Sequence, residues 1–293
     1  MPELPKGLTP LIFAFVADLM AAQPIETAAG RLGYRVRVVA RASDIVAEHA
    51  FNPAGQAAEP VFGPQADLVE AVTASQPALI IFDLANEMIP WREWLAVLKS
   101  SPATRRIPVV CFGPHVRADL FRAARERAAD AVVARSRFFA DLPALIERNA
   151  RRPDLEAIHA SCRQPLSQLA QAGIAAFNRG DYFEAHELLE EAWIEDEGAG
   201  QELYRAVLQV AVAYLQIERA NYVGAVKMFL RARQWLRPLP AECRGLDIGR
   251  LRADADAVHL ALSEAGLEGV ADFDRSLLRP VRLTATQSGA SST

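Results

Sequence analysis

The chain has 293 residues, 51% of them hydrophobic and 23% charged, with a formal net charge of −4 at pH 7. This length allows two domains with cores of their own, and the slightly acidic balance leaves no basic surface for nucleic acid, which we exclude as an expected partner. No apolar stretch approaches the roughly 20 residues that cross a bilayer, so we expect a cytoplasmic protein without a membrane partner.

The first half alternates short β-branched runs with helical stretches. The pattern predicts strands over 11–16, 35–40, 78–83, 108–112 and 131–134, and helices over 23–32, 65–74, 91–99, 118–128 and 138–149. Such alternation is typical of a parallel sheet with helices on both faces. Residues 43–64 contain turn signals and are expected to form a long, partly irregular loop whose role the sequence does not reveal.

Three strand segments resemble those of a known family. Ala78-Leu-Ile-Ile-Phe-Asp83, Ile107-Pro-Val-Val-Cys-Phe112 and Ala129-Asp-Ala-Val-Val-Ala-Arg135 match in order and spacing the third, fourth and fifth strands of the receiver domain of two-component response regulators. The resemblance covers about residues 8–150. It implies a flavodoxin-like, five-stranded parallel sheet, a role in signal transduction, and a homodimer formed through the receiver-like domain.

The same resemblance implies a phosphorylation site that is altered here. Receivers accept a phosphoryl group on an aspartate at the end of the third strand, here Asp83, with a magnesium ion held partly by an acidic pair after the first strand. In this chain the pair is reduced to Asp18, preceded by Ala17. Gly113 replaces the hydroxyl residue and Arg135 the lysine of receivers. We therefore predict a degenerate receiver. The structural alternative to Asp83 as phosphoacceptor is that its side chain caps the following turn.

The second half is predicted to be all-helical. Its helices are expected over 155–162, 166–178, 182–194, 201–219, 222–236 and 248–265, the first as a connecting helix before a bundle of about five. Arg151-Arg152-Pro153 is a natural breakpoint. We therefore divide the chain into a receiver-like domain at 1–152, a helical bundle at 153–280 and a disordered tail at 281–293. The fold class is α/β plus all-α.

One helix of the bundle carries polar residues on an otherwise apolar face. With 3.6 residues per turn, Tyr182, His186, Glu190 and Trp193 fall on one arc of the helix over 182–194. Glu190 lies one turn beyond His186 on the side expected to face the core, where a carboxylate needs a partner.

The next helix supplies candidate partners for that pair. It is apolar except for a narrow stripe that includes Arg205 and Gln209. We expect these two to meet His186 and Glu190 in a pocket for a small ligand or protein partner, roofed by Tyr182 and Trp193. The alternative is a buried network in which Glu190 holds His186 and Arg205 and fixes the pairing of two helices.

A metal site is a more specific hypothesis for the same residues. His186 and Glu190, four residues apart, could present two ligands to a divalent metal ion on one helix face, although a third ligand is missing. Cys111, Cys162 and Cys243 have no paired spacing, so neither a zinc site nor a disulfide is expected. No nucleophile motif is evident.

The polar helix also carries a second resemblance. Phe177-Asn178, Tyr182-Phe-Glu-Ala-His-Glu-Leu-Leu-Glu190 and Trp193, followed by Gln209-Val-Ala-Val-Ala213 and Asn221-Tyr-Val-Gly-Ala225, resemble the bacterial and archaeal "domain of unknown function 309" family over about residues 168–237. The resemblance implies a small helical domain whose motif residues gather on facing helices, and it brings no established activity.

We therefore predict a regulatory or interaction protein with a degenerate receiver-like docking domain and a helical domain that holds a His-Glu polar pocket. Two alternatives stay open. One is a metal-assisted hydrolase at His186 and Glu190, and the other is a phosphorylatable response regulator with Asp83 as acceptor.

Overall fold

The structure is a computed structural model of the chain, and it describes residues 9–45 and 60–284. The chain divides into two compact units, Met1–Arg152 and Pro153–Thr293, which we call the sheet unit and the helical unit. Each is described by itself. Within the described residues, no helix is long and apolar enough to cross a membrane.

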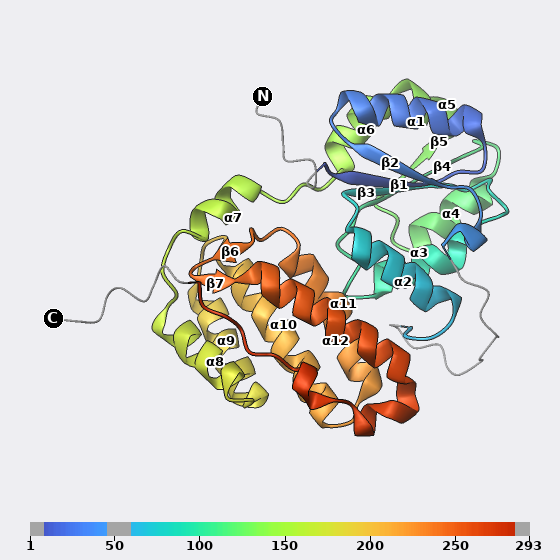
Figure 1. The fold of residues 1–293 in the computed structure, drawn as a ribbon. Helices are drawn as coiled ribbons and strands as arrows, with labels where there is room; N and C mark the ends of the chain where they lie inside the picture. Colours follow the sequence, from blue (N-terminus) through green and yellow to red (C-terminus); the bar gives the residue numbers. More distant parts are fainter. Residues whose placement is uncertain (1–8, 46–59, 285–293) are drawn as a thin grey trace. The chain divides into compact units, whose positions relative to one another are not determined.

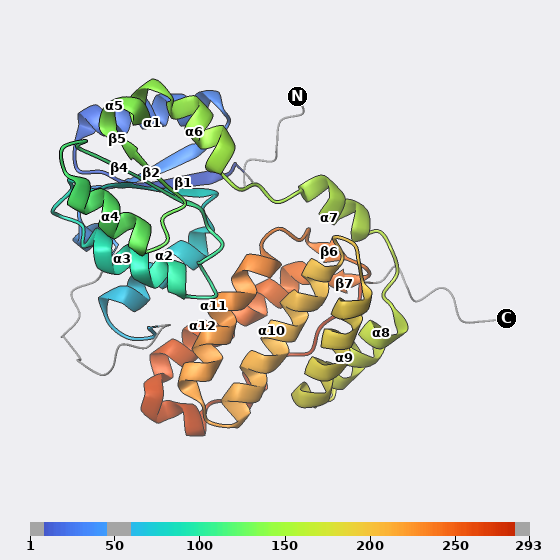
Figure 2. The same ribbon diagram turned by 180° about the vertical axis from the view of Figure 1, so that it is seen from behind.

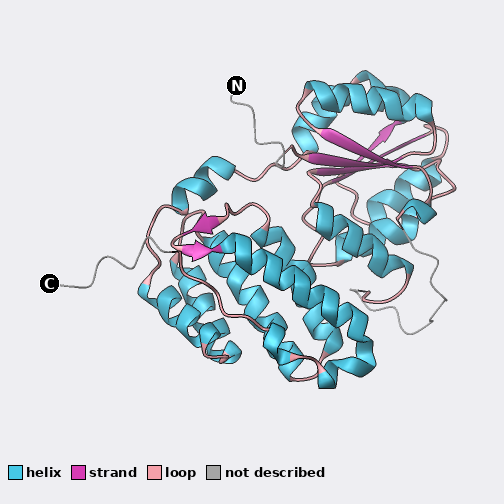
Figure 3. Cartoon of the chain, viewed as in Figure 1, coloured by secondary structure: helices cyan, strands magenta, loops and turns pink. Residues whose placement is uncertain are grey.

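The sheet unit is built on a five-stranded parallel sheet (Figure 1, Figure 3). Its strands are β1 (Leu11–Phe15), β2 (Arg35–Val39), β3 (Leu79–Asp83), β4 (Val109–Gly113) and β5 (Ala131–Ala134). They lie in the order β2-β1-β3-β4-β5, and every neighbouring pair is parallel. This is the strand order of flavodoxin-like folds, so the predicted fold class is confirmed.

Helices cover both faces of this sheet (Figure 2). They are α1 (Leu19–Arg31), α2 (Pro64–Ser75), α3 (Trp91–Ser100), α4 (Ala118–Glu126), α5 (Arg135–Ala140) and α6 (Leu142–Asn149). Alternate strand residues point to opposite faces. Ile12 and Phe112 pack with α1, α5 and α6, whereas Phe13 and Phe82 pack with α2, α3 and α4. The carboxyl ends of the strands therefore meet at one edge of a rigid, doubly covered sheet.

Two helices of this unit differ from their predicted bounds. We expected α1 to begin at Gln23, but it begins at Leu19 because the Asp18 side chain accepts a hydrogen bond from the Met20 amide at 2.8 Å and caps the helix. The last predicted helix is two helices, α5 and α6, which meet at Asp141. The predicted loop over 43–64 lies mostly outside the described residues.

The helical unit contains α7 (Leu155–Ser161), α8 (Gln168–Asn178), α9 (Tyr182–Glu195), α10 (Gln201–Glu218), α11 (Tyr222–Leu236) and α12 (Ile248–Gly269), with a short hairpin of β6 (Glu242–Cys243) and β7 (Leu246–Asp247). Polar caps fix the helix starts. Asp181, Asn221 and Asp247 accept hydrogen bonds from backbone amides three residues later. α10 lies between α9 and α11 and is buried over most of its length (Figure 1).

The end of the described chain differs from the expected tail. Residues 281–284 are ordered, because Val281 and Asn178 exchange two hydrogen bonds, at 2.8 and 2.9 Å, and the Thr284 amide donates to the Gly245 carbonyl at 2.8 Å. The rest of the predicted tail lies outside the described residues.

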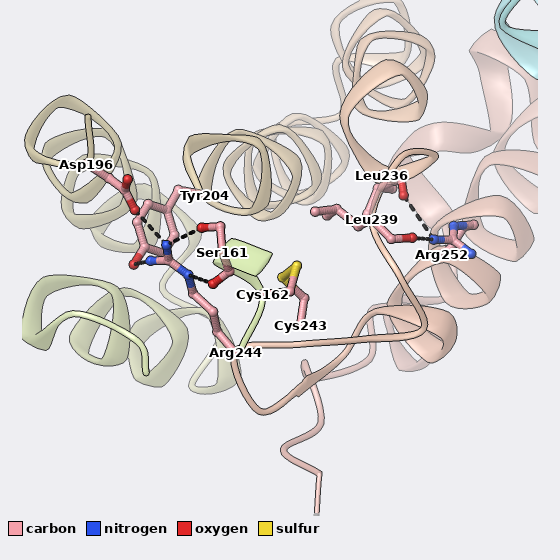
Figure 4. Close-up of a disulfide and its surroundings, with 9 residues drawn as sticks. All are labelled: Ser161, Cys162, Asp196, Tyr204, Leu236, Leu239, Cys243, Arg244 and Arg252. Carbon is pink, nitrogen blue, oxygen red and sulfur yellow. Dashed lines mark hydrogen bonds and ion pairs between the residues drawn. A yellow bond between two sulfur atoms is a disulfide. The ribbon is translucent and has the colours of Figure 1, made fainter. Parts of the chain in front are cut away.

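A disulfide joins Cys162, just after α7, to Cys243 in β6 (Figure 4). The sequence expectation of no disulfide is therefore wrong. The two cysteines are 81 residues apart, so no local spacing signals the pair, and the fold alone brings them together. Cys111, in β4, is free and buried, and burial raises the pKa of its thiol far above the usual range.

The buried Arg244 ties four segments together next to this disulfide (Figure 4). Its guanidinium donates to the Ser161 hydroxyl at 2.8 Å and to the Tyr204 hydroxyl at 2.5 Å, and it forms an ion pair with Asp196 at 2.9 Å. Its backbone amide donates to the Cys162 carbonyl at 2.7 Å. A buried charge with these partners is a structural feature, and sequence reasoning did not identify it.

Candidate functional site

The predicted phosphoacceptor lies in an ion pair at the carboxyl edge of the sheet. Asp83 ends β3, and Arg135 directly follows β5. The Arg135 Nη2 donates a short hydrogen bond to Asp83 Oδ2, and the Ala85 amide donates to Asp83 Oδ1 at 3.0 Å. The Asp83 side chain is 5% exposed and that of Arg135 36%. Both carboxylate oxygens are therefore engaged, and a fixed positive charge stands beside them.

Further contacts hold Arg135 in this position. Its guanidinium carbon lies 5.1 Å from the centre of the Phe112 ring, the residue before Gly113 at the end of β4. A methyl group added at Gly113 would come within 3.2 Å of the Leu84 Cβ. A hydroxyl residue at this position would therefore require Leu84 to shift by a few tenths of an ångström. The structure gives Asp18 a capping role at the start of α1.

A pocket of about 370 Å³ opens beside this ion pair, between the segments that follow β3 and β4. It is of the size that small ligands use. Its charged lining residues are Glu87, Arg92, Glu93 and Arg117, two of each sign. Arg117 pairs with Asp119 at 2.8 Å. The balanced lining indicates no ligand class, and none of the predicted site residues Asp18, Asp83 and Arg135 lines this pocket.

In the helical unit, the predicted His-Glu pair is accessible to solvent. His186 Nε2 and Glu190 Oε2 are 4.0 Å apart, one turn of α9 apart, with side chains 32% and 47% exposed. Glu190 is thus not the buried carboxylate that the helical wheel suggested. The pair is also not sealed in a core network, so it can be reached from solution.

Arg205 of α10 lies between two tryptophan rings. Its guanidinium carbon is 4.3 Å from the ring centre of Trp193 on α9 and 4.8 Å from that of Trp235 on α11. Trp193 is itself fixed by a hydrogen bond from its indole nitrogen to Gln201 Oε1 at 3.2 Å. Among the described residues Arg205 makes no hydrogen bond or ion pair, so the expected contact with Glu190 or His186 is not formed.

The other two predicted residues have different surroundings. Tyr182 is buried against the rings of Phe177 and Tyr214, at 5.3 and 5.4 Å, so it packs into the core instead of roofing a pocket. Burial, with the nearby charge of Glu218, raises the pKa of Tyr182 to about 12. Gln209 follows Arg205 by one turn, and its Oε1 is buried without a hydrogen-bond partner in the described part of the chain.

Two sets of contacts indicate the register of α10 against its neighbours. At one end, Arg205 lies close to the rings of Trp193 and Trp235. At the other end, Asn221, which caps α11, donates to Gln216 Oε1 of α10 at 2.7 Å. Because neighbouring helices run antiparallel, we expect Gln209, one turn from Arg205, at the level of Glu190. We call the expected surface the α9–α11 face. Its residues are His186, Glu190, Trp193, Arg205, Gln209 and Trp235.

A metal ion at this face would have few protein ligands. Within residues 9–45 and 60–284, no group of three or more histidine, cysteine, aspartate and glutamate side chains is arranged to hold a metal ion. His186 and Glu190 could supply two ligands, and zinc sites in proteins use at least three. Metal binding at this pair stays a hypothesis.

Comparison with known proteins matches the segment that carries all residues of this face except Trp235. Residues 170–228 match the family model described as "Domain of unknown function (DUF309)". The uncharacterized protein YpuF of Bacillus subtilis is 42% identical over 77 residues, which cover 24% of this chain and 42% of YpuF. An uncharacterized protein of Aquifex aeolicus is 28% identical over 102 residues, covering 34% of this chain and 30% of that protein. The chain thus spans less than half the length of these curated relatives.

Solved structures match the other half. The phosphorylated cyanobacterial phytochrome response regulator RcpA is 20% identical, with a TM-score of 0.36, and the match covers 47% of this chain and 91% of that one. The orphan response regulator HP1043 of H. pylori is 16% identical, with a TM-score of 0.34, and the match covers 50% of this chain and 100% of that one. These likenesses concern the fold alone. Residues 170–228 of the helical unit therefore match the DUF309 family model, and the sheet unit has the receiver-like fold that its strand order defines.

Proposed function

We propose that this chain is a regulatory or interaction protein whose sheet unit acts as a docking module without phosphorylation of Asp83. In the same proposal, the helical unit binds a small ligand or a protein partner through the α9–α11 face. The observation that carries the first part is the Arg135–Asp83 ion pair.

Phosphoryl transfer requires one Asp83 carboxylate oxygen to reach the phosphorus atom of a donor. At Asp83 one oxygen accepts from Arg135 and the other from the Ala85 amide. Attack through the paired oxygen opposes the ion pair with Arg135, because it turns the buried carboxylate away from its cationic partner.

The chain also lacks the parts that would support the reaction. The Asp18 carboxylate is used as a helix cap, and Ala17 precedes it, which leaves a weak set of ligands for magnesium. Arg135 keeps a positive charge, but its planar guanidinium pairs with Asp83, where a lysine would present a compact ammonium group. These features support a sheet unit held in one state by its own arginine.

The partner implied for such a docking module is a second copy of the chain, joined through the sheet unit. Sedimentation velocity of the full chain, with acetyl phosphate and magnesium present or absent, tests the proposal. We expect the same sedimentation coefficient in both conditions and in the variant Asp83→Asn. A change produced by acetyl phosphate in the natural chain and absent from Asp83→Asn would show that phosphorylation controls assembly and would end the proposal.

The helical part of the proposal is supported by the solvent exposure and the unsatisfied polar atoms of its residues. His186 and Glu190 are part-exposed, and Arg205 and Gln209 have polar atoms without partners among the described residues. A purely structural network would satisfy those atoms internally. The face therefore has the properties of a recognition surface.

A further inference from the structure

We propose that Arg205 anchors a binding site for a small carboxylate ligand that also carries a hydrogen-bond donor, such as a hydroxy acid or an amino acid. The inference rests on the helical half of the proposed function, because it names the ligand class for the α9–α11 face.

The first argument is the orientation of Arg205. Indole rings lie 4.3 and 4.8 Å from its guanidinium carbon, one on α9 and one on α11. Cation–π contacts hold the guanidinium without supplying an oxygen acceptor, so they leave its N–H donors for a ligand. The hydrogen bond from Trp193 to Gln201 fixes one of the two rings, so the guanidinium is positioned before any ligand arrives.

The second argument is that the edge of Arg205 has no partner. A guanidinium has five N–H donors, and within the described residues those of Arg205 reach no acceptor in the protein. Arg244 shows the opposite arrangement, since its donors reach Ser161, Tyr204 and Asp196. An arginine fixed by stacking, with its donors open, is suited to a planar, bidentate partner, and a carboxylate has that geometry.

The third argument concerns the group next to the carboxylate. Gln209 lies one turn from Arg205 on α10, and its Oε1 is buried without a donor in the described structure. A buried acceptor without a partner is costly, and a ligand hydroxyl or ammonium group would satisfy it. A ligand that reaches both residues therefore carries a donor close to its carboxylate.

Charge favours a carboxylate over a phosphate. Glu190 is expected at the level of Gln209, and its side chain is 47% exposed. Its negative charge repels a dianionic phosphate more strongly than a monoanionic carboxylate, and it would attract the ammonium group of an amino acid.

The experiment titrates the full-length protein with glycine, glycolate, acetate and inorganic phosphate while the indole N–H resonances of Trp193 and Trp235 are followed by NMR. We expect saturable shifts with glycine or glycolate, affinity about tenfold weaker for acetate, which lacks the donor, and weaker still for phosphate. Arg205→Lys keeps the charge and removes the planar fork, so we expect an affinity loss of about tenfold or more. Arg219→Ala, at the exposed end of α10, is the matched control and should bind like the natural chain.

Three results would overturn the proposal. They are no saturable shift with any of the four probes, unchanged binding in Arg205→Lys, or tighter binding of phosphate than of the carboxylates. The lysine variant retains a stackable cation, and its fold is checked by circular dichroism. A negative result in this titration would not bear on the role of Asp83, because that role is tested by measuring assembly and phosphorylation of the sheet unit.

Discussion

The Cys162–Cys243 disulfide should contribute several kcal/mol, about 2–5, to the stability of the helical unit. Replacing both cysteines by serine removes a link that closes a loop of 81 residues. In the chain-entropy treatment, such a loop restricts the unfolded chain by about 15 cal/mol/K, which is about 4.5 kcal/mol at 25 °C. The hydrogen bonds of Arg244 to Ser161 and Cys162 do not depend on the disulfide, so the native fold of the double variant should persist at lower stability.

Urea unfolding followed by tryptophan fluorescence measures this loss. Trp91 and Trp94 belong to the sheet unit and Trp193 and Trp235 to the helical unit, so a background with the first two replaced by phenylalanine reports on the helical unit. We expect the free energy of unfolding to fall by about 4 kcal/mol, within the usual range of about 2–5 kcal/mol. The m-value should rise, because the unlinked chain exposes more surface when it unfolds.

Single variants provide the control for this prediction. Cys162→Ser and Cys243→Ser each break the same bond, so each should lose nearly as much stability as the double variant, and the natural protein treated with a dithiol should behave alike. If the double variant unfolded at the same urea concentration as the oxidised natural chain, the reasoning about the disulfide would be refuted.

Three further predictions concern other sites. Gly200→Ala should destabilise the helical unit by about 2 kcal/mol in urea. The added Cβ would lie 1.8 Å from the guanidinium of Arg244, which is buried and would lose hydrogen bonds if it moved. Gly198→Ala, whose Cβ would lie 3.2 Å from Asp196 Oδ1, should cost less. Burial raises the pKa of Tyr182 from 10.0 to about 12, so its contribution to stability should be complete below pH 10 and lost as the pH rises toward 12. In thermal melts, Tyr182→Phe should therefore lose less stability at alkaline pH than the natural protein. An unchanged alkaline loss in this variant would show that Tyr182 is not its source. Zinc should not change the melting temperature of the natural protein in a way that depends on His186. A stoichiometric shift that is lost in His186→Ala would support the hydrolase alternative.

Much of the fold could be predicted because its signals are local. The strands that end at Asp83 and Ala134 are short apolar runs between turn residues, and the caps at Asp181 and Asn221 mark where α9 and α11 begin. The predicted start of α1 at Gln23 is wrong because the helix is capped by Asp18, several residues earlier.

The candidate site could be predicted in part, because helical periodicity gives the face of a residue and not its partner. Periodicity placed His186 and Glu190 together, and the structure holds them 4.0 Å apart. It could not show that Arg205 lies between Trp193 and Trp235, because that contact depends on the register of three helices. Nor could it show the pairing of cysteines 81 residues apart, which the tertiary fold alone determines.

The most direct test of the central claim is the intact mass of the full chain after incubation with acetyl phosphate and magnesium. The pairing of Asp83 with Arg135 predicts no phosphorylated species in the natural chain or in the neighbouring control Arg137→Lys, whose side chain is exposed and pairs with Asp141. Stoichiometric phosphorylation of the natural chain, mapped to Asp83, would contradict a sheet unit that works without phosphorylation.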